Sequence, residues 1–310
     1  MKKTDIMIIG GGIAGLTAAI YTSRAGLKTI VLENNSAGGQ ITTSAKIENY
    51  PGFEEISGAE LSSKVLSQAV RCGAVFDEFD PISEVNLNDR TVKTKNELYQ
   101  CGVIIIASGA SPKKLEAGGA DELEGKFIHY CAACDGAFYK NKRTIVVGGG
   151  NSAAEGAIFL SDIAESVVMI VRGDALKAEK TYVSEIERRK NIEVKFHAEI
   201  AKVDHNNECI ITAKDGNVIK ADGIFVFIGS RASTELVSAQ LETDSQGYIV
   251  CDDEMQTSMP GVFAVGDVRQ KKVRQLTTAA SDGTIAAFSA QRFLFNYRQN
   301  QMKKENGEIK

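Results

Sequence analysis

The sequence lacks any apolar run of the roughly 18 residues that a membrane-spanning helix needs, so no such helix is expected. It also lacks an excess of basic side chains, because the net charge is −4, and this argues against a general nucleic-acid-binding protein. The chain begins Met1-Lys2-Lys3 and turns apolar at Ile6, but the apolar stretch ends at Gly10, too early for a signal peptide. We therefore expect a first β-strand here rather than a leader.

Cysteine is sparse, and its placement excludes two further classes of protein. Only Cys131 and Cys134 form a close pair among six cysteines, which does not fit the disulfide framework of a secreted protein. We therefore expect a cytoplasmic protein. The pair could be half of a zinc site, but zinc needs about four nitrogen or sulfur ligands, and only His129 lies near it in the sequence. No metal site is expected.

The composition is that of an ordinary globular protein, with 43% hydrophobic and 25% charged residues in 310, which favours about two domains. A glycine motif, Gly10-x-Gly12-x-x-Gly15, follows an apolar strand and opens a helical run. Such glycines let the backbone approach a pyrophosphate at the helix N-terminus. The next apolar strand ends at Glu33, where an acid binds ribose hydroxyls. The pattern predicts dinucleotide binding.

A second unit of the same kind follows, with Gly148, Gly150 and Ala153 in a G-x-G-x-x-A motif between a strand and a helix. Two such units form an internal repeat and indicate two nucleotides, one the donor to the other. The fold class expected is α/β, with two Rossmann-like three-layer domains. Each carries short strands that resemble a meander, at residues 75–79, 84–87 and 91–94 in the first and 193–196, 199–204, 209–212 and 218–220 in the second.

The last part of the chain resembles neither repeat by itself. It holds a short strand that ends in Gly266-Asp267 and then a long helical run. We expect it to complete the first domain. Residues 1–115 and 244–310 would then form one domain, and residues 116–243 an inserted domain that carries the cysteine pair.

Cys131 and Cys134 can close a small, easily reduced disulfide in which one sulfur is held as thiolate after reduction. Asp135 follows directly and can move a proton for that chemistry. Because this pair lies between two nucleotide motifs, the sequence indicates that electrons pass through a flavin to a disulfide. Two unreactive buried thiols are the alternative.

Taken together, the chain resembles the low-molecular-weight, flavin-dependent thioredoxin reductases over nearly its whole length. The resemblance rests on ordered motifs at Gly10 to Gly15, Gly38-Gly39-Gln40, Glu48 to Gly52, Cys131 to Gly136, Gly148 to Ala153, and Gly261 to Asp267 followed by Arg274-Gln275. It implies FAD in the first domain, held by Gly10, Gly12, Gly15, Glu33, Gly39, Gln40, Asn49, Asp267, Arg274, Gln275 and Leu276.

The same resemblance implies the roles of the redox residues. Cys134 would face the flavin, Cys131 would attack the disulfide of thioredoxin, and Asp135 would be the general acid–base. It also implies a homodimer and a rotation of the inserted domain about linkers near Gly118 and Asp244.

The sequence departs from the family where the electron donor is chosen. Members that use NADPH carry His-Arg-Arg-x-x-x-Arg for the 2′-phosphate, and the matching residues here are Val171, Arg172, Gly173 and Lys177. Lysine cannot make the planar bidentate contact of arginine. Two lost charge-assisted hydrogen bonds would weaken NADPH binding by roughly two to four powers of ten.

The donor therefore stays open. NADPH would be held by Gly148, Gly150, Ala153, Arg172 and Lys177, whereas ferredoxin is the donor in a branch of relatives that lacks these arginines. The acceptor is a second open point: a peroxidase or a glutaredoxin-like protein could replace thioredoxin. A non-catalytic flavin sensor with a dithiol switch is the remaining alternative.

Overall fold

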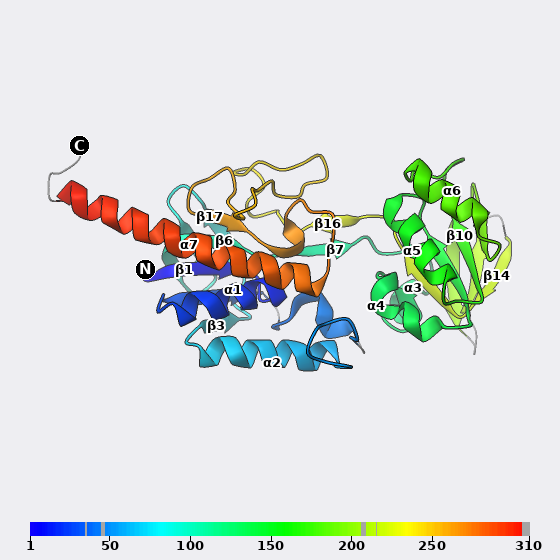
Figure 1. Cartoon of the computed structure of the whole chain (residues 1–310), viewed down its shortest axis with the longest axis horizontal. Helices are drawn as coiled ribbons and strands as arrows, with labels where there is room; N and C mark the ends of the chain where they lie inside the picture. The colour runs from blue at the N-terminus through cyan, green and yellow to red at the C-terminus, as the bar shows by residue number, and fades with distance from the viewer. Residues whose placement is uncertain (35, 45–46, 206–208, 215, 306–310) are drawn as a thin grey trace. The chain divides into compact units, whose positions relative to one another are not determined.

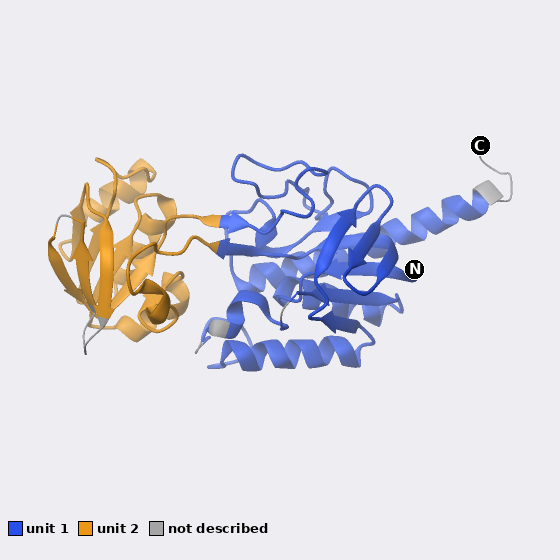
Figure 2. Ribbon diagram, turned by 180° about the vertical axis from the view of Figure 1, so that it is seen from behind, with its two compact units in different colours: residues 1–111, 231–310 blue, residues 112–230 orange. Residues whose placement is uncertain are grey.

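The computed structural model describes residues 1–34, 36–44, 47–205, 209–214 and 216–305 (Figure 1). The chain divides into two compact units (Figure 2). The first unit contains Met1–Ser111 and Arg231–Lys310, and the second contains Pro112–Ser230. The second unit is thus inserted into the first, and the chain passes between them through two strands that pair with each other, β7 (Ala110–Pro112) and β16 (Ser230–Ala232).

These crossings differ from the boundaries and linkers expected from sequence. The first crossing lies a few residues before residue 115, and the second lies well before residue 243. Gly118 donates its N–H to Ala201 O inside the second unit, and Asp244 donates its N–H to Tyr248 O inside the first. The segment after residue 230 belongs to the first unit because its apolar side chains, among them Val237, Leu241 and Ile249, are buried in that core.

The first unit is built on a seven-stranded sheet with the order β3-β2-β1-β6-β5-β4, in which β17 also pairs with β6. The long strand β6 has room for both neighbours, because β5 pairs with its first half and β17 with its second. The strands are β1 (Lys2–Ile9), β2 (Thr29–Glu33), β3 (Val75–Glu78), β4 (Ile82–Asn86), β5 (Thr91–Thr94), β6 (Leu98–Ile106) and β17 (Val262–Ala264). The helices are α1 (Ile13–Arg24), η1 (Gly39–Thr43), α2 (Gly58–Arg71), η3 (Gly266–Val268) and α7 (Leu276–Glu305).

Both faces of this sheet are buried. Along β1, Ile6 and Ile8 pack against α1 and α7, whereas Met7 and Ile9 point to the opposite face. There they pack in one cluster with apolar side chains of β4, β5 and the chain that leads to β17. Strands buried on both sides read as continuous apolar runs, which is why β1, β2 and β6 were recognisable in the sequence.

The second unit repeats this plan. Its five-stranded parallel sheet has the order β11-β10-β9-β15-β8, and a three-stranded antiparallel sheet, β12-β13-β14, covers one face. The strands are β8 (Ile128–His129), β9 (Arg143–Val147), β10 (Ser166–Ile170), β11 (Ile192–Lys195), β12 (Ile200–His205), β13 (Cys209–Ala213), β14 (Val218–Ala221) and β15 (Gly223–Val226). The helices are α3 (Ala120–Leu123), α4 (Ala132–Asp135), η2 (Gly136–Tyr139), α5 (Asn151–Ser161) and α6 (Lys180–Arg188).

Two strands expected in the meanders belong to the parallel sheets instead. β3 pairs in parallel with β2, and β11 pairs in parallel with β10. Each is a short edge strand with partly exposed side chains, so its pattern lacks the continuous apolar run of the central strands. Among the described residues, no helix is both long and apolar enough to cross a membrane.

The packing of α7 on α1 generates a prediction about stability. Gly283 lies in α7, and a β-carbon there would sit 2.3 Å from the carbonyl oxygen of Ala14 in α1. Gly283→Ala should therefore lower the free energy of unfolding by about 1–3 kcal/mol through overpacking. This loss exceeds the stabilisation expected from the higher helix propensity of alanine relative to glycine. Urea unfolding followed by circular dichroism measures the change.

Gly173→Ala is the matched control, because a β-carbon at Gly173 would meet its nearest neighbour at 3.7 Å. Its unfolding midpoint should stay near that of the wild type. A Gly283→Ala variant as stable as the wild type would contradict the prediction. It would show that α1 and α7 can move apart without loss of free energy of unfolding.

Candidate active site

The first glycine loop is shaped by backbone contacts that leave no room for a side chain at Gly10 or Gly15. Gly10 has φ of 110°, and a β-carbon on it would lie 2.4 Å from Ala107 O. A β-carbon on Gly15 would lie 2.0 Å from Gly10 O, so α1 begins directly against β1. At Gly12, which precedes α1, a β-carbon would meet no described atom within 4 Å. The loop is therefore tight on the protein side and open on the other, as a pyrophosphate requires.

Glu33 is part of this loop rather than a separate contact. Its Oε2 accepts a hydrogen bond of 2.7 Å from the N–H of Gly11. The N–H of Gly38 donates to Gly11 O at 2.9 Å, which brings the segment with Gly39 and the exposed Gln40 against the glycine loop. The predicted dinucleotide residues from three parts of the sequence thus lie together at the carboxyl ends of β1 and β2.

Asp267 carries the clearest sign of a ligand-binding position. Its Oδ1 is buried and has no hydrogen-bond partner among the described residues. Burial raises the pKa of the Asp267 carboxyl, and the charges of Lys271 and Arg274 oppose that rise. A buried acceptor without a donor is costly, so a hydroxyl-bearing ligand would satisfy it. This arrangement fits the sugar-alcohol chain of a flavin.

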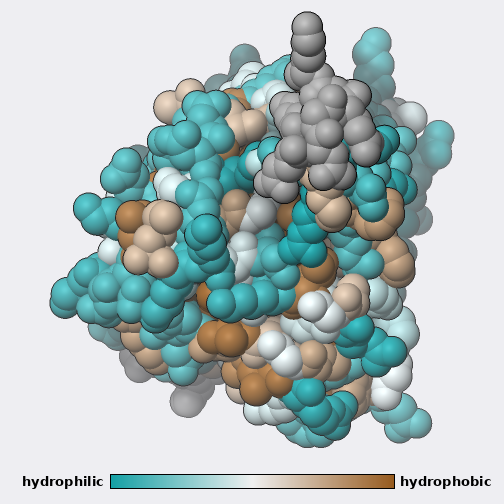
Figure 3. All heavy atoms as spheres, turned by 90° about the vertical axis from the view of Figure 1, so that its left-hand side faces the viewer, coloured by the Kyte–Doolittle hydropathy of each residue, from teal (hydrophilic) through white to brown (hydrophobic). Residues whose placement is uncertain are grey.

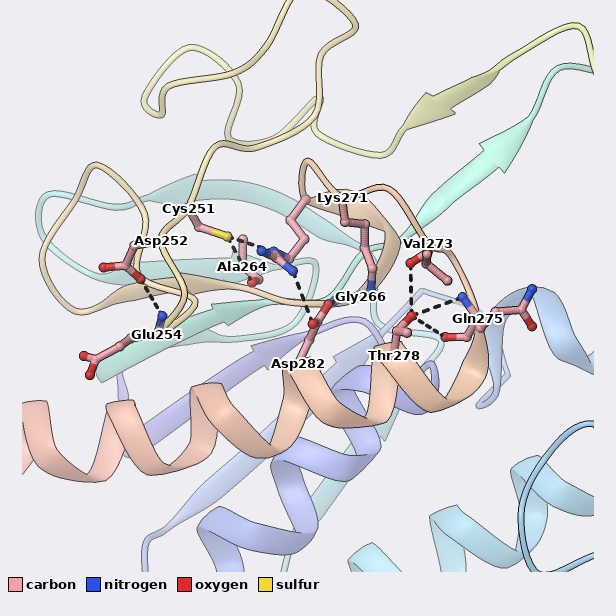
Figure 4. Close-up of polar contacts among 11 residues, drawn as sticks. Cys251, Asp252, Glu254, Ala264, Gly266, Lys271, Val273, Gln275, Thr278 and Asp282 are labelled. Atoms are coloured by element: carbon pink, nitrogen blue, oxygen red, sulfur yellow. Dashed lines mark hydrogen bonds and ion pairs between the residues drawn. The ribbon is translucent and has the colours of Figure 1, made fainter. Parts of the chain in front are cut away.

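Asp282, which the sequence analysis missed, holds the backbone of Gly266, the residue before Asp267; Figure 4 shows Asp282 with Gly266 and Lys271. Its Oδ2 accepts from the N–H of Gly266 at 3.0 Å and pairs with Lys271 at 2.8 Å, and its Oδ1 lies 3.3 Å from Arg269 Nη1. Cys251 Sγ is 3.0 Å from Arg269 Nε. The side chains of Asp282 and Lys271 are less than a tenth exposed. A carboxylate on a helix usually faces solvent, so its spacing gave no signal of this buried network.

The start of α7 completes this region. Asn49 Nδ2 donates to Gln275 Oε1 at 3.3 Å, which joins residues far apart in the sequence. Leu276 packs in an apolar cluster that includes Ile13 of α1. The guanidinium of Arg274 lies over the ring of Tyr248, 4.2 Å from its centroid. All the residues proposed for FAD therefore belong to the first unit.

The second glycine loop has the same construction in the other unit. Gly148 has φ of 136°, and a β-carbon on it would lie 2.2 Å from Phe227 O. Ala153 is fully buried, whereas a β-carbon at Gly150 would meet no described atom within 4 Å. This loop is also closed toward the protein and open on the other side, so its shape fits a nucleotide phosphate.

The segment beside this loop offers few groups to a 2′-phosphate. Val171 is buried, and a β-carbon on Gly149 would lie 2.9 Å from its Cγ1. Lys177 donates its backbone N–H to Gly149 O at 2.7 Å while its side chain is exposed. Arg172 is exposed as well, and its charge acts on Glu199: the hydrogen bond from Lys214 chiefly lowers the pKa of that carboxyl, and Arg172 adds to the effect.

The redox pair lies in the second unit, where Cys131 and Cys134 form a disulfide with their Cα atoms 5.3 Å apart. Cys131 precedes the short helix α4, and Asp135 ends it. The Oδ2 of Asp135 lies 3.4 Å from Nδ1 of His129. The sequence analysis weighed His129 only as a zinc ligand, whereas the structure gives it a carboxylate partner. Within the described part of the chain, no group of three or more histidine, cysteine or acidic residues could hold a metal ion.

Comparisons with known proteins agree with this geometry. The family model described as pyridine nucleotide-disulphide oxidoreductase matches residues 4–283. A protein of Clostridium pasteurianum, described as a 34.2 kDa protein in the rubredoxin operon, is 43% identical over 94% of this chain and 98% of its own length. The thioredoxin reductase of Listeria monocytogenes is 39% identical over 96% of both chains.

Among solved structures, the thioredoxin reductase of Streptococcus pyogenes is 35% identical, with a TM-score of 0.88 over 95% of this chain and 99% of the other. Family model, sequence identity and fold agree over nearly the whole length of the chain. The chain therefore belongs to the pyridine nucleotide-disulphide oxidoreductase family and, within it, to the low-molecular-weight thioredoxin reductases.

Proposed function

We propose that this protein is a cytoplasmic, FAD-dependent thioredoxin-disulfide reductase. Electrons pass from a donor to FAD, then to the Cys131–Cys134 disulfide, and finally to the disulfide of thioredoxin. The observation that carries the proposal is this disulfide, followed by Asp135, in a chain similar to thioredoxin reductases over nearly its whole length. The family works with a flavin and a nucleotide, and both open glycine loops suit such ligands.

The flavin-binding residues are assigned by their fit. FAD, when bound, supplies the two-electron carrier between the donor and the disulfide. Gly10, Gly12 and Gly15 allow its pyrophosphate to approach the backbone at the start of α1. Asp267 accepts a hydrogen bond from the sugar-alcohol chain. The remaining contacts come from the neighbouring residues Glu33, Gly39, Gln40, Asn49, Arg274, Gln275 and Leu276.

The disulfide exchange itself uses residues of the second unit. Reduction converts the Cys131–Cys134 disulfide into two thiols, with the uptake of two electrons and two protons. The Cys131 thiolate attacks one sulfur of thioredoxin, and the other sulfur of thioredoxin leaves as a thiolate. The Cys134 thiolate then attacks Cys131, which restores the disulfide and releases the second thiolate. Asp135 provides a proton to a leaving thiolate.

Replacing Cys134 tests the central step. Cys134→Ser should abolish thioredoxin reduction, because no second thiolate remains to resolve the mixed disulfide. The variant should still purify yellow, since the proposed flavin residues lie in the other unit. Two measurements check this prediction. The rate of thioredoxin reduction by enzyme with reduced flavin reports turnover, and the visible absorption spectrum reports bound flavin. Cys72→Ser, at a free cysteine of the first unit, is the matched control and should stay active. Thioredoxin reduction by Cys134→Ser would refute the proposal.

We further propose NADPH as the donor, bound weakly. The glycine loop at Gly148, Gly150 and Ala153 is intact, and Arg172 and Lys177 are the two cations beside it. Ferredoxin is the second candidate donor, favoured by the buried Val171 and by the missing arginines. Anaerobic titrations with NADPH, NADH and reduced ferredoxin separate these donors by the bleaching of the flavin spectrum.

Restoring the arginines gives a directional test. Gly173→Arg has room for a side chain, since the nearest atom to a β-carbon there is 3.7 Å away, and Lys177 is exposed. The double variant Gly173→Arg, Lys177→Arg should bind NADPH roughly two to four powers of ten more tightly, because it regains two charge-assisted contacts. Flavin bleaching against NADPH concentration measures the affinity.

Lys202→Arg, an exposed lysine on the antiparallel sheet of the same unit, controls for added guanidinium and should leave the affinity unchanged. An unaltered affinity in the double variant would mean that this loop does not bind the 2′-phosphate. Wild-type bleaching by reduced ferredoxin, but not by NADPH at micromolar levels, would assign the donor role to ferredoxin. The acceptor is checked in the same assay with a peroxidase and a glutaredoxin-like protein in place of thioredoxin.

We also propose that the protein is a homodimer through the first unit. Phe288, Phe295 and Met302 recur every seven residues along α7, and each is more than half exposed. Residues seven apart share one face of a helix, so they form an apolar stripe. Tyr21 of α1 adjoins it, with its ring 5.8 Å from that of Phe288. Figure 3 shows apolar surface among polar side chains at this end of the first unit. Such stripes mark protein contacts.

A charge in the stripe should disrupt the dimer. Phe295→Asp is expected to sediment as a monomer at micromolar concentration, because it would bury an unpaired carboxylate at the contact. Analytical ultracentrifugation gives the result. Phe196→Asp, at an exposed phenylalanine of the second unit, should remain dimeric. A monomeric wild-type protein, or a dimeric Phe295→Asp variant, would contradict this proposal.

A further inference from the structure

His129 lies in a nearly closed setting beside the redox pair. It is the last residue of β8, two positions before Cys131, and is 8% exposed. Its Nδ1 faces Asp135 Oδ2 at 3.4 Å, and its Nε2 lies 2.6 Å from the hydroxyl of Tyr139. Its ring stacks on Phe225 with the centroids 5.3 Å apart. Both ring nitrogens therefore have polar partners, and one partner is the proposed acid–base.

Both ring nitrogens of His129 have a polar partner whether the ring is neutral or protonated. When the ring is neutral with its proton on Nδ1, that proton faces Asp135 and the Tyr139 hydroxyl donates to Nε2; when its proton is on Nε2, Nε2 donates to the Tyr139 oxygen. When the ring is protonated, Nε2 donates to the Tyr139 oxygen, and the Tyr139 hydroxyl turns to the carbonyl oxygen of Lys126 at 3.5 Å. Both ring nitrogens of His129 therefore keep a polar partner in either state.

The charged and titratable groups around the ring are few. Asp135 comes from α4 and Tyr139 from η2, and Phe225 of β15 closes the stacked face. Lys142 lies over the ring of Tyr139, 5.5 Å from its centroid. Asp135 is therefore the one carboxylate of the described chain paired with His129, and it directly follows Cys134.

Each turn releases two thiolates of the acceptor, and the protons that they need come from the thiols of Cys131 and Cys134 as these become thiolates. One carboxyl group holds only one of these protons at a time. We propose that His129 is the proton store for Asp135: the protonated ring holds the second proton, and after Asp135 has protonated one leaving thiolate, Nδ1 of His129 returns a proton to its carboxylate. The ring is then neutral and keeps its other proton on Nε2, toward the Tyr139 oxygen. His129 acts through Asp135, so it is a positioning residue. This inference rests on the proposed disulfide exchange, and it deepens that function.

The variant His129→Asn tests the inference. Asparagine can keep a donor near the position of Nδ1, but it cannot hold a second proton. Enzyme reduced with dithiothreitol and freed of reductant is mixed with one of two disulfides. Hydroxyethyl disulfide releases an alkyl thiolate, which must be protonated, and dithiobis(nitrobenzoate) releases an aromatic thiolate, which leaves without a proton. His129→Asn should slow the first reaction about tenfold at about pH 7 and leave the second unchanged.

Three further measurements separate proton transfer from a structural role. Added imidazole buffer should restore the rate of His129→Asn, because a small acid can replace the missing store. Tyr139→Phe keeps the ring packing on Phe225 but removes the partner of Nε2, and should show a smaller loss of the same kind. His197→Asn, at an exposed histidine of the same unit, should behave as wild type with both disulfides.

Two results would overturn the inference. One is that His129→Asn slows the reactions with both disulfides equally. The other is that His129→Asn reacts with hydroxyethyl disulfide at the wild-type rate. Oxidised thioredoxin, tested in parallel, separates this failure from that of the proposed function. A wild-type enzyme that reduces hydroxyethyl disulfide but not thioredoxin would remove the proposed acceptor, and the comparison of the two small disulfides would still decide the role of His129.

Discussion

The close contact between the first strand and the helix that follows it governs the architecture of each unit. In the first unit there is no space for a β-carbon between Gly15 and the carbonyl of Gly10, and in the second the fully buried Ala153 occupies the equivalent position near Gly148. This contact sets where each helix begins and aims its first N–H groups at the open side of the loop. The shape of both proposed nucleotide sites follows from this one steric requirement.

The units then differ in what surrounds the loop. In the first, a buried ion network around Asp282 holds the turn that carries Asp267, and one carboxylate oxygen of Asp267 is buried without a hydrogen-bond partner among the described residues. In the second, a valine and two exposed cations flank the loop. The buried polar network of the first unit suits a cofactor that stays bound. The few exposed groups beside the second loop suit a donor that binds only transiently.

Local features were the ones that could be predicted from sequence. The glycine loops, the cysteine pair and the central strands depend on residues close together in the chain, and the family and the fold class that they indicated are confirmed. The Asn49–Gln275 contact, the role of Asp282 and the pairing of His129 with Tyr139 depend on tertiary packing, which no spacing reveals. The boundary after Ser230 was misplaced because Val237 and Leu241 gave no periodic signal, although both are buried in the first core.

The insertion has a consequence for the order in which the chain acquires structure during synthesis. The second unit is one continuous segment, so all of its strands have left the ribosome before the first unit is complete. The first unit must wait for β17 and α7, which supply a strand of its sheet and a helix of its core. Because domains fold as units, the inserted part matures first. The early half of the outer unit therefore stays incomplete until β17 and α7 have been made, and the residues proposed for the flavin come together only then.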